Sequence, residues 1–427
     1  MSDRLIRQPN PMPLMVLMFL LVASTVGGLI GRPVVAVAEA RPDIVLVLSD
    51  DMNDDDWRSL PKAKAFLPAE FPNYINTDPL CCPSRASILT GLYPHNHGTW
   101  GNDTGPSGGW QSFRNREDAT IATMLSKSGY RTGLIGKYLN NYEPKAGPRP
   151  GWDYWFAFGK PEYKPFDAVE GHKVKTWHKY STDVVATKAT AFIASSGKAT
   201  PLFAYVTPKP PHAPTTPPKR YAKDCRNDPV PVVDKPSFHV KIIDGPAYVS
   251  HGMSHYDKSR LVHLDRKRQC ALKALDDLIV DVHAALEKRG RPYYLFVASD
   301  NGYLLGEHGG VGKRAPYDES TRTMMRATSG GGAPAITGSD HLVANIDWMA
   351  TFAELSGATP PYQTDGQSIL TGPERDLIVI ESKKQDHDDV RDDAFETLRP
   401  PSYRGCTWRQ AKHMSVFRWL YRILHGR

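Results

Sequence analysis

The stretch Pro42–Asp51, PDIVLVLSDD, contains the pattern that decides the fold. Its apolar residues Ile44 to Leu48 are continuous rather than alternating, which is typical of a strand buried on both faces of a parallel sheet. The strand runs directly into Ser49, Asp50 and Asp51. A buried strand that ends in two adjacent acids indicates a sheet with chemically active side chains at one edge.

Further apolar runs have the same character, and helical patterns lie between them. The expected strands are 132–135, 202–206, 294–298 and 377–380, and the expected helices are 120–128, 183–194, 269–288 and 347–355. Strands that alternate with helices predict an α/β fold with helices on both faces of the sheet. Strong periodicity ends near Gln367, so we expect one large domain over 41–366 and a small C-terminal segment over 367–427.

Polar residues follow several of these strands. They are Lys137 after 132–135, His212 in the proline-rich loop after 202–206, and Asp300 and Asn301 after 294–298. In an open parallel sheet the carboxyl ends of the strands face one crevice. Three carboxylates and a carboxamide gathered there would require a cation, and such hard oxygen ligands favour Ca²⁺ or Mg²⁺ over zinc. The acidic run Asp54 to Asp56 is interpreted as a solvated loop.

Residues 79–91, PLCCPSRASILTG, form the most specific signal in the chain. Pro83 suits the first turn of a helix and Gly91 its end, so Cys81 is expected just before a helix N-terminus. Backbone N–H groups and the helix dipole stabilise an anion there. Cys81 is therefore the candidate nucleophile toward a sulfate or phosphate, and Cys82 is interpreted as a small packed residue.

The composition excludes some classes of protein. The chain has 427 residues, 40% of them hydrophobic, and a formal net charge of +7, which is typical of a globular protein. The Lys and Arg residues are scattered and form no basic stripe with interleaved aromatics, so nucleic acid is not an expected partner. A mildly basic surface is compatible with polyanionic substrates.

The N-terminus has the order of an export signal. Arg4 and Arg7 precede an apolar run from Met12 to about Ile30, and small residues follow at Ala36–Ala40. This order predicts a signal peptide over residues 1–40 and an exported protein in a secreted, periplasmic or lysosome-like compartment. The alternative is an uncleaved anchor, because the run approaches the ~20 apolar residues that span a bilayer. Membrane contact is expected only in that case.

The cysteine count is odd. Cys81 and Cys82 are adjacent, which is poor geometry for a bond between them. The remaining cysteines are Cys225, Cys270 and Cys406. In an exported chain one or two disulfides are expected among the cysteines, and no spacing marks a zinc site.

Three motifs together resemble the type I sulfatases of the alkaline phosphatase superfamily. They are Cys81-x-Pro83-Ser84-Arg85 with Thr90-Gly91, Gly129-Tyr130-Arg131-Thr132-x-x-x-Gly136-Lys137, and Ser299-Asp300-Asn301-Gly302 with Gly306-Glu307-His308-Gly309 and Lys313. The resemblance runs from about Pro42 to Gly357. It implies an alkaline-phosphatase-like sheet, a sulfatase catalytic domain over 41–366, and a partner machinery that oxidises the first cysteine of the signature to formylglycine.

The resemblance also implies roles for individual residues. The implied Ca²⁺ ligands are Asp50, Asp51, Asp300, Asn301 and the modified Cys81, and the implied catalytic residues are Cys81, Arg85, Lys137, His212 and Lys313. Arg85 would hold the hydrated aldehyde, and the lysines and histidine would contact the sulfate or the leaving oxygen. One hydroxyl of the hydrate would attack sulfur, and loss of the other proton would release sulfate and restore the aldehyde.

The substrate expectation rests on a variant motif. Many sulfatases have histidine two residues after the lysine of the second motif, whereas this chain has Leu139. Lys137-Tyr138-Leu139-Asn140 and the segment 93–97, YPHNH, resemble the N-acetylglucosamine-6-sulfatase branch, which implies a sulfated carbohydrate substrate. His95 and His97 are interpreted as structural or substrate-lining residues.

Two departures from the family pattern keep alternatives open. Residues 321–330 replace an expected hydrophobic strand, which predicts a weakened core strand, and the chain ends earlier than most relatives. The alternatives are an arylsulfatase, a phosphate or phosphonate monoester hydrolase, and an inactive carbohydrate-binding remnant. Matched aryl sulfate and aryl phosphate substrates distinguish the first two.

Overall fold

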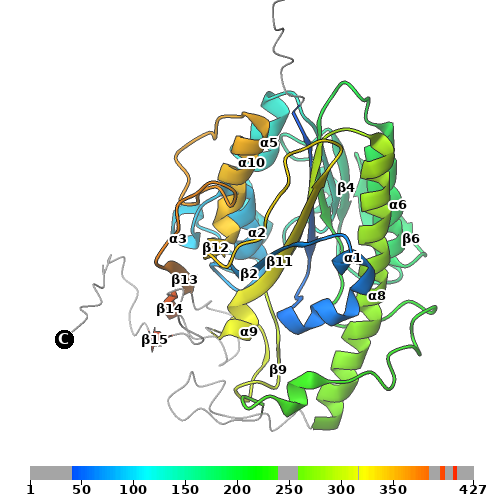
Figure 1. The fold of residues 1–427 in the computed structure, drawn as a ribbon, viewed down its shortest axis with the longest axis vertical. Helices are drawn as coiled ribbons and strands as arrows, with labels where there is room; N and C mark the ends of the chain where they lie inside the picture. The colour runs from blue at the N-terminus through cyan, green and yellow to red at the C-terminus, as the bar shows by residue number, and fades with distance from the viewer. Residues whose placement is uncertain (1–40, 239–257, 316, 384–394, 400–406, 411–427) are drawn as a thin grey trace, which may run out of the picture. The chain divides into compact units, whose positions relative to one another are not determined.

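The computed structural model describes residues 41–238, 258–315, 317–383, 395–399 and 407–410, as Figure 1 shows. The predicted signal peptide, residues 1–40, lies outside this part of the chain, and so does Cys406. Among the described residues, no helix has both the length and the apolar character needed to cross a membrane.

A ten-stranded mixed sheet forms the centre of the described residues. Its strands, from one edge to the other, are β12 (Val343–Ala344), β2 (Ala69–Ile75), β11 (Arg322–Gly330), β8 (Tyr293–Ser299), β1 (Asp43–Ser49), β7 (Leu202–Thr207), β3 (Arg131–Gly136), β4 (Tyr154–Phe158), β5 (Phe166–Glu170) and β6 (Lys173–Trp177). Neighbouring strands from β8 to β4 are parallel, whereas β11 and β5 run antiparallel to their neighbours. The remaining strands are the hairpin β9 (Leu304–Leu305) and β10 (Val311–Gly312), and β13 (Ile378–Ser382), β14 (Phe395–Arg399) and β15 (Thr407–Gln410).

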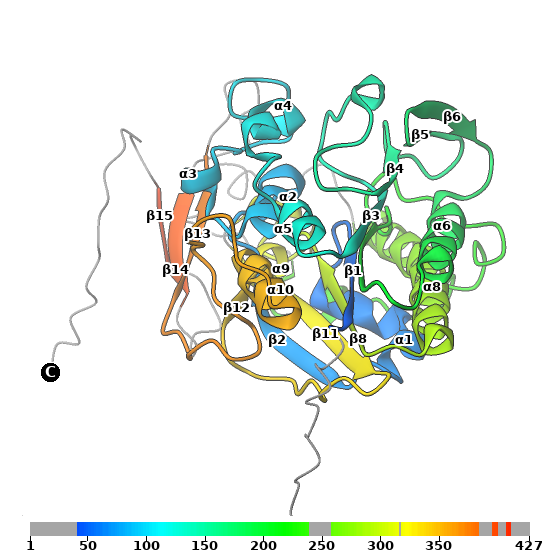
Figure 2. The same ribbon diagram turned by 90° about the horizontal axis from the view of Figure 1, so that it is seen from above.

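Helices cover both faces of the sheet. The described helices are α1 (Pro61–Lys64), α2 (Cys81–Thr90), α3 (Pro94–His97), α4 (Gly109–Phe113), α5 (Ile121–Lys127), α6 (Ser181–Ser195), α8 (Lys258–Arg289), α9 (Asp318–Thr321) and α10 (Trp348–Ser356), with short 3₁₀ helices that include η1 (Asp54–Ser59). Figure 2 shows α2, α5 and α10 on one side of the sheet and α6 and α8 on the other. The fold class predicted from the sequence is confirmed.

Strand β1 lies in the middle of the sheet and contributes to both cores. Ile44, Leu46 and Leu48 pack toward α2, α5 and α10, while Val45 and Val47 pack toward α6 and α8. All five are fully buried. Burial of an aliphatic side chain of this size contributes roughly 1.5–3 kcal/mol, so the continuous apolar run is what two covered faces require.

The predicted elements agree with the structure except in four places. The first is the helix predicted over 269–288, because α8 begins earlier, at Lys258. The run 377–380 forms β13, but this strand pairs antiparallel with β14 in a separate small sheet and is not a parallel strand of the large one. The segment 321–330, where a weakened strand was expected, forms β11, which pairs with both β2 and β8 and has a register shift against β2 between Thr323 and Met325. The acidic run 54–56 is not a solvated loop, because η1 buries Asp56 completely.

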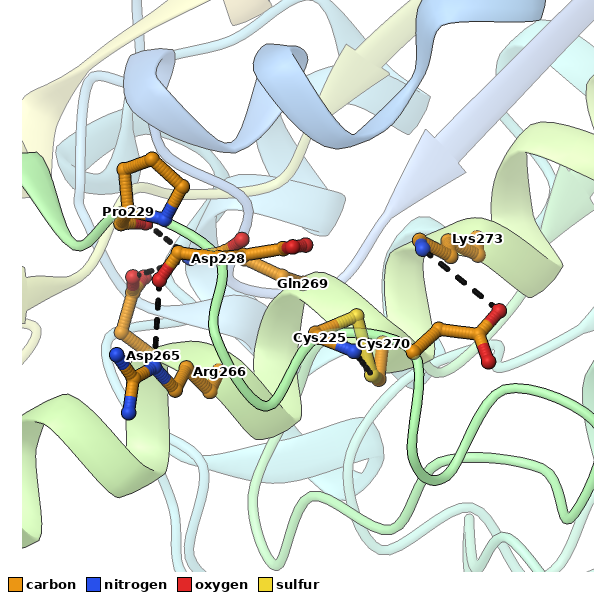
Figure 3. Close-up of a disulfide and its surroundings, with 9 residues drawn as sticks. Cys225, Asp228, Pro229, Asp265, Arg266, Gln269, Cys270 and Lys273 are labelled. Atoms are coloured by element: carbon orange, nitrogen blue, oxygen red, sulfur yellow. Dashed lines mark hydrogen bonds and ion pairs between the residues drawn. A yellow bond between two sulfur atoms is a disulfide. The ribbon is translucent and has the colours of Figure 1, made fainter.

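One disulfide is present in the described part of the chain, between Cys225 and Cys270 (Figure 3). It connects the long loop after β7 to α8. Gln269 reinforces the attachment by donating to the carbonyl of Pro229 at 2.9 Å. Cys81 and Cys82 are free thiols. The expectation of one or two disulfides is met by this bond.

Candidate active site

The strands that precede the predicted polar residues are direct neighbours, in the order β8, β1, β7 and β3. They are parallel, so their carboxyl ends meet at one edge of the sheet. The N–H of Asp300 donates to the carbonyl of Ser49 at 3.1 Å, which joins the end of β8 to the end of β1. The structure thus brings together the acids and cations that lie far apart in the sequence.

Cationic side chains of this cluster surround the carboxylate of Asp50. Lys137 Nζ donates to its Oδ2 at 2.7 Å, and Arg85 Nη2 lies 3.6 Å from the same oxygen. Burial raises the pKa of this carboxyl, but Lys137, His212, Arg85 and Lys313 outweigh burial and hold the pKa well below its usual value. Asp50 is therefore a buried carboxylate in its ionised form.

Asp51 holds a left-handed backbone conformation, with φ of +69°. Such a conformation costs a non-glycine residue about 1–2 kcal/mol and persists only where the surroundings fix it. Its N–H donates to Asp300 Oδ1 at 3.1 Å, and its Oδ1 accepts from Asn301 Nδ2 at 2.7 Å and Lys313 Nζ at 2.5 Å. His212 Nε2 lies 3.7 Å from Oδ2. The carboxylate thus faces several elements at once.

Cys81 is the first residue of α2, in agreement with the sequence prediction for this helix end. Its Sγ lies 2.7 Å from Lys313 Nζ and 3.5 Å from Asp50 Oδ1. Burial raises the pKa of the thiol to about 12 despite the opposing effect of Lys137 and Lys313. The next amide, that of Cys82, donates to Asn102 Oδ1 at 2.9 Å, so one free N–H of the helix end is used by this side chain.

Arg85 and Asp300 form a fully buried ion pair, with Nε donating to Oδ2 at 2.8 Å. Arg85 also donates to the carbonyl of Lys137 at 3.1 Å. Burial, together with Asp50, raises the pKa of Asp300 to about 6 against the opposing effect of Arg85 and Lys137. The contacts of Arg85 therefore connect α2 to the ends of β8 and β3.

His212 reaches the cluster from the proline-rich loop after β7. Its Nδ1 contacts the carbonyl of Ala213, which directs Nε2 toward Asp51. Tyr163 holds the loop by donating to the His212 carbonyl at 3.0 Å. Burial lowers the pKa of His212, although Asp50 and Asp51 oppose the change.

One group of potential metal ligands stands out among the described residues. Ligand atoms of Asp50, Asp51, Cys81 and His212 all lie within 4.8 Å of one another. Asp300 and Asn301 are adjacent, through their bonds to Asp51, but are not part of this group. His212, which the sequence assigned to substrate, is thus as close to the acids as Cys81 is.

Sequence reasoning missed three residues that support the cluster. Asn102 contacts the N-terminus of α2, Lys209 donates to the carbonyl of Pro161 at 2.5 Å beneath the His212 loop, and Arg268 donates to the carbonyl of Asp51 at 2.7 Å. Asn102 and Arg268 do not follow a predicted strand, so no sequence signal marked them. Lys209 lies in the same proline-rich loop after 202–206 as His212, and that position was the signal that could have found it.

The two histidines of the 93–97 segment have structural contacts. His97 is buried, with Nε2 3.1 Å from Ser87 Oγ and Nδ1 accepting from the N–H of Thr99 at 3.0 Å. His95 Nδ1 lies 2.8 Å from Glu381 Oε1 on β13. The segment therefore connects α2 to the small C-terminal sheet.

Comparison with known families identifies the class of protein. The model of the sulfatase family matches residues 42–358, which include every residue of the cluster. The chain belongs to the sulfatase family.

Individual relatives agree with this assignment. Human N-acetylglucosamine-6-sulfatase is 33% identical over 377 residues, which is 82% of this chain and 67% of the relative. The extracellular sulfatase SULF-1 homolog of Drosophila melanogaster is 32% identical over 363 residues, 78% of this chain and 31% of the relative. The chain thus spans about a third of the fly protein and two thirds of the human one.

Solved structures share the fold. A protein in complex with its substrate D-glucosamine-2-N,6-O-disulfate has a TM-score of 0.68 at 19% identity, covering 84% of this chain and 87% of that one. A phosphonate monoester hydrolase of Agrobacterium radiobacter has a TM-score of 0.62 at 16% identity, covering 86% of this chain and 88% of that one. At these identities the likeness shows the fold alone.

Proposed function

We propose that this protein hydrolyses sulfate esters of sulfated sugars of the N-acetylglucosamine-6-sulfate type. The observation that carries the proposal is the cluster itself. Asp50, Asp51 and Cys81 converge within 4.8 Å at the carboxyl edge of the sheet, in a chain of the sulfatase family. Lys137 and Lys313 contact the same three side chains.

The residues of the cluster fit a divalent cation. Asn301 Oδ1 is buried and has no hydrogen-bond partner among the described residues, and it lies beside Asp51, to which its own Nδ2 donates. Carboxylate and carboxamide oxygens are the ligands that Ca²⁺ prefers. We assign Asp50, Asp51, Asp300 and Asn301, with residue 81, as the residues that would hold Ca²⁺. The ion would supply positive charge to a sulfate oxygen and to the nucleophile.

Residue 81 is proposed to be formylglycine in the mature enzyme. Its hydrate would supply a hydroxyl as the nucleophile toward sulfur in place of the thiol. Cys81 stands in the structure for this residue, so the contacts of its Sγ with Lys313 and Asp50 mark where that hydroxyl would lie. Arg85 supports the surroundings of residue 81 through its ion pairs with Asp300 and Asp50.

The exposed fractions of the cations separate two roles. The side chains of His212 and Lys313 are 28% and 15% exposed, whereas that of Lys137 is only 4% exposed. His212 Nε2 and Lys313 Nζ therefore face an incoming ester. Lys313 offsets the charge of the ester oxygens and delivers a proton to the departing alkoxide, whereas His212, whose pKa is lowered by burial, contacts the ester as a neutral imidazole. The buried Lys137 instead keeps Asp50 ionised through their ion pair.

The relatives support a sugar substrate. The human relative is named N-acetylglucosamine-6-sulfatase, and a structural neighbour was solved with a disulfated glucosamine. Contacts to a sugar ring would orient the ester toward residue 81.

The test compares kcat/KM for N-acetylglucosamine-6-sulfate saccharides, an aryl sulfate and the matched aryl phosphate at one ionic strength. We expect kcat/KM to be highest for the N-acetylglucosamine-6-sulfate saccharides, lower for the aryl sulfate and lowest for the aryl phosphate. The Cys81→Ala variant should keep its fold, as measured by circular dichroism, and lose turnover. Mass spectrometry of the peptide that contains residue 81 should show formylglycine, and a free thiol in fully active protein would disprove the nucleophile assignment.

Each alternative predicts a different outcome of this test. Preference for the aryl sulfate with no sugar cleaved would indicate an arylsulfatase, and preference for the phosphate would indicate a phosphorus ester hydrolase, the activity of the Agrobacterium neighbour. Absence of turnover with retained sugar binding would indicate an inactive remnant. The convergence of the cluster residues supports the proposal of an active enzyme.

We also propose export, with residues 1–40 removed and 41–366 as the catalytic domain. The support is the order of basic, apolar and small residues at the N-terminus and the extracellular name of the fly relative. N-terminal sequencing of secreted protein tests the cleavage, and an intact N-terminus in the membrane fraction would indicate an anchor.

A further inference from the structure

The backbone of Asp51 has a hydrogen-bond partner, Arg268, that is not one of the candidate catalytic residues. Asp300 and Asn301 bind its N–H and one carboxylate oxygen, and both come from the end of β8. The carbonyl oxygen of Asp51 faces the other way and accepts from Arg268 Nη2 at 2.7 Å. A left-handed aspartate persists only where its surroundings fix it, so the partner of this carbonyl, together with Asp300 on the N–H, holds the conformation.

The burial and the contacts of Arg268 fix its guanidinium at the carbonyl of Asp51. It lies on the long helix α8, its side chain is 1% exposed, and its Nη2 also donates to Asp56 Oδ2 at 2.5 Å. Its guanidinium lies 4.7 Å from the ring centroid of Tyr303, just beyond Asn301 in sequence. Asp56 in turn accepts from the N–H of Asn53 at 3.0 Å. Arg268 thus attaches the segment that follows Asp51 to α8, and Arg58 of η1 adds a second bond, to Asp265 of α8.

The geometry separates Arg268 from the catalytic residues. Its bonds are to a backbone carbonyl and to Asp56, and Nε has no hydrogen-bond partner in the described part of the chain. It therefore acts on the site only through the orientation of Asp51. A side chain of this kind resembles the partners that orient metal ligands in other proteins, whose loss typically lowers metal affinity 10- to 100-fold.

We propose that Arg268 is a positioning residue for the cation site: by fixing the Asp51 carbonyl, it holds the Asp51 carboxylate in the orientation that binds the ion. The inference rests on the proposed Ca²⁺ site. Without this bond Asp51 relaxes from its left-handed conformation, and its carboxylate turns from Asn301 and residue 81.

The experiment measures Ca²⁺ binding directly, by isothermal titration calorimetry on chelator-treated full-length protein. We expect Arg268→Met to raise the Kd for Ca²⁺ about 10- to 100-fold. Arg268→Lys keeps the charge with a shorter reach, so it should lie between Arg268→Met and the wild type. The rise in Tm on adding Ca²⁺ should shrink in the same order, because stabilisation by a ligand follows its Kd.

Two matched variants separate positioning from general stability. Arg266→Met removes a neighbouring arginine of α8 whose Nε donates to the Asp228 carbonyl at 3.2 Å, and it should leave the Kd unchanged. Asp56→Asn weakens the same buried ion pair but leaves Arg268 able to reach Asp51. It should lower the metal-free Tm while the Kd stays close to that of the wild type.

The outcomes are distinguishable. If the wild type binds no Ca²⁺, the proposed metal site fails and not this inference alone. If the wild type binds Ca²⁺ and Arg268→Met binds it equally well, the inference is overturned, even where the metal-free Tm falls. If Arg268→Met does not fold, Arg268→Lys decides by the same comparison of Kd.

Discussion

At the residue scale, the cationic side chains of the site differ in burial. This difference decides whether the acid that loses its partner on substitution is solvated. Arg85 is fully buried against Asp300. Lys313 also contacts an acid, Asp51, but part of its side chain reaches the surface. Removal of one partner of a buried pair leaves an uncompensated charge, whereas a charge near the surface is solvated.

We therefore predict different costs for two substitutions. Arg85→Met should lower the free energy of unfolding by about 3–5 kcal/mol, because Asp300 stays buried without its partner. Lys313→Met should cost clearly less stability while lowering kcat/KM at least as strongly. Chemical denaturation of metal-free protein gives the first quantity and steady-state kinetics the second. Equal losses of stability would contradict the burial argument.

His97 gives a prediction for pH. Its Nδ1 accepts from the backbone N–H of Thr99, so the ring is neutral, and burial lowers its pKa to about 3. The unfolded histidine titrates near its ordinary pKa of about 6.5. The folded pKa is the lower one, so the stabilisation is present above about pH 6.5 and is lost as pH falls toward the folded pKa.

The measurement is the loss of unfolding free energy caused by His97→Asn at two pH values. We expect this loss to be smaller at pH 5.5 than at pH 7.5, by roughly 1.4 kcal/mol. The same substitution cost at both values would show that the buried imidazole does not control this part of the pH profile.

The position of each site residue within its element explains whether it could be predicted from the sequence. Asp50, Lys137 and Asp300 follow apolar strands directly, and strand ends of a parallel sheet share one edge, so their convergence was predictable. Arg268 lies within a helix and Asn102 within a loop. Their contacts depend on how these elements pack, which the local pattern does not encode.

At the scale of elements, the long loop after β7 is held to α8 by the disulfide Cys225–Cys270. The two cysteines are separated by 45 residues. Closing a loop of that length in the unfolded chain is worth about 4 kcal/mol in the chain-entropy model.

We predict that the double variant Cys225→Ala/Cys270→Ala loses up to about 4 kcal/mol of unfolding free energy, measured by urea denaturation. A reductant should reproduce this loss in the wild type and have no effect on the variant. A reductant effect of equal size in both proteins would assign the stabilisation to another disulfide.

Strands β11 and β13 show where the element prediction and the structure differ. β11 carries Thr323, Arg326 and Ser329, which interrupt the apolar run expected of a central strand. It forms because β2 and β8 satisfy its backbone on both sides, and Arg326 is largely buried near Trp57, its guanidinium 5.3 Å from the ring centroid. β13 is apolar like a parallel strand, but pairing partners are set by topology and not by composition.

At the scale of the whole molecule, the net positive charge of the chain should affect the encounter with substrate. Long-range attraction is screened within a Debye length, about 10 Å at 0.1 M salt. We predict that kcat/KM falls with increasing NaCl, and more steeply for a disulfated glucosamine than for a monosulfated one. Identical slopes for the two substrates would show that local contacts alone govern association.

The position of β1 has a consequence for timing. β1 pairs with β8, so Ser49 aligns with Ser299 across a separation of most of the chain. During synthesis from the N-terminus, residue 81 emerges long before β8 exists to close the sheet. In the finished fold Cys81 has no exposed surface. An enzyme that oxidises this thiol must therefore act after residue 81 emerges and before β1 pairs with β8. Variants that fold faster would shorten that interval and yield less modified protein.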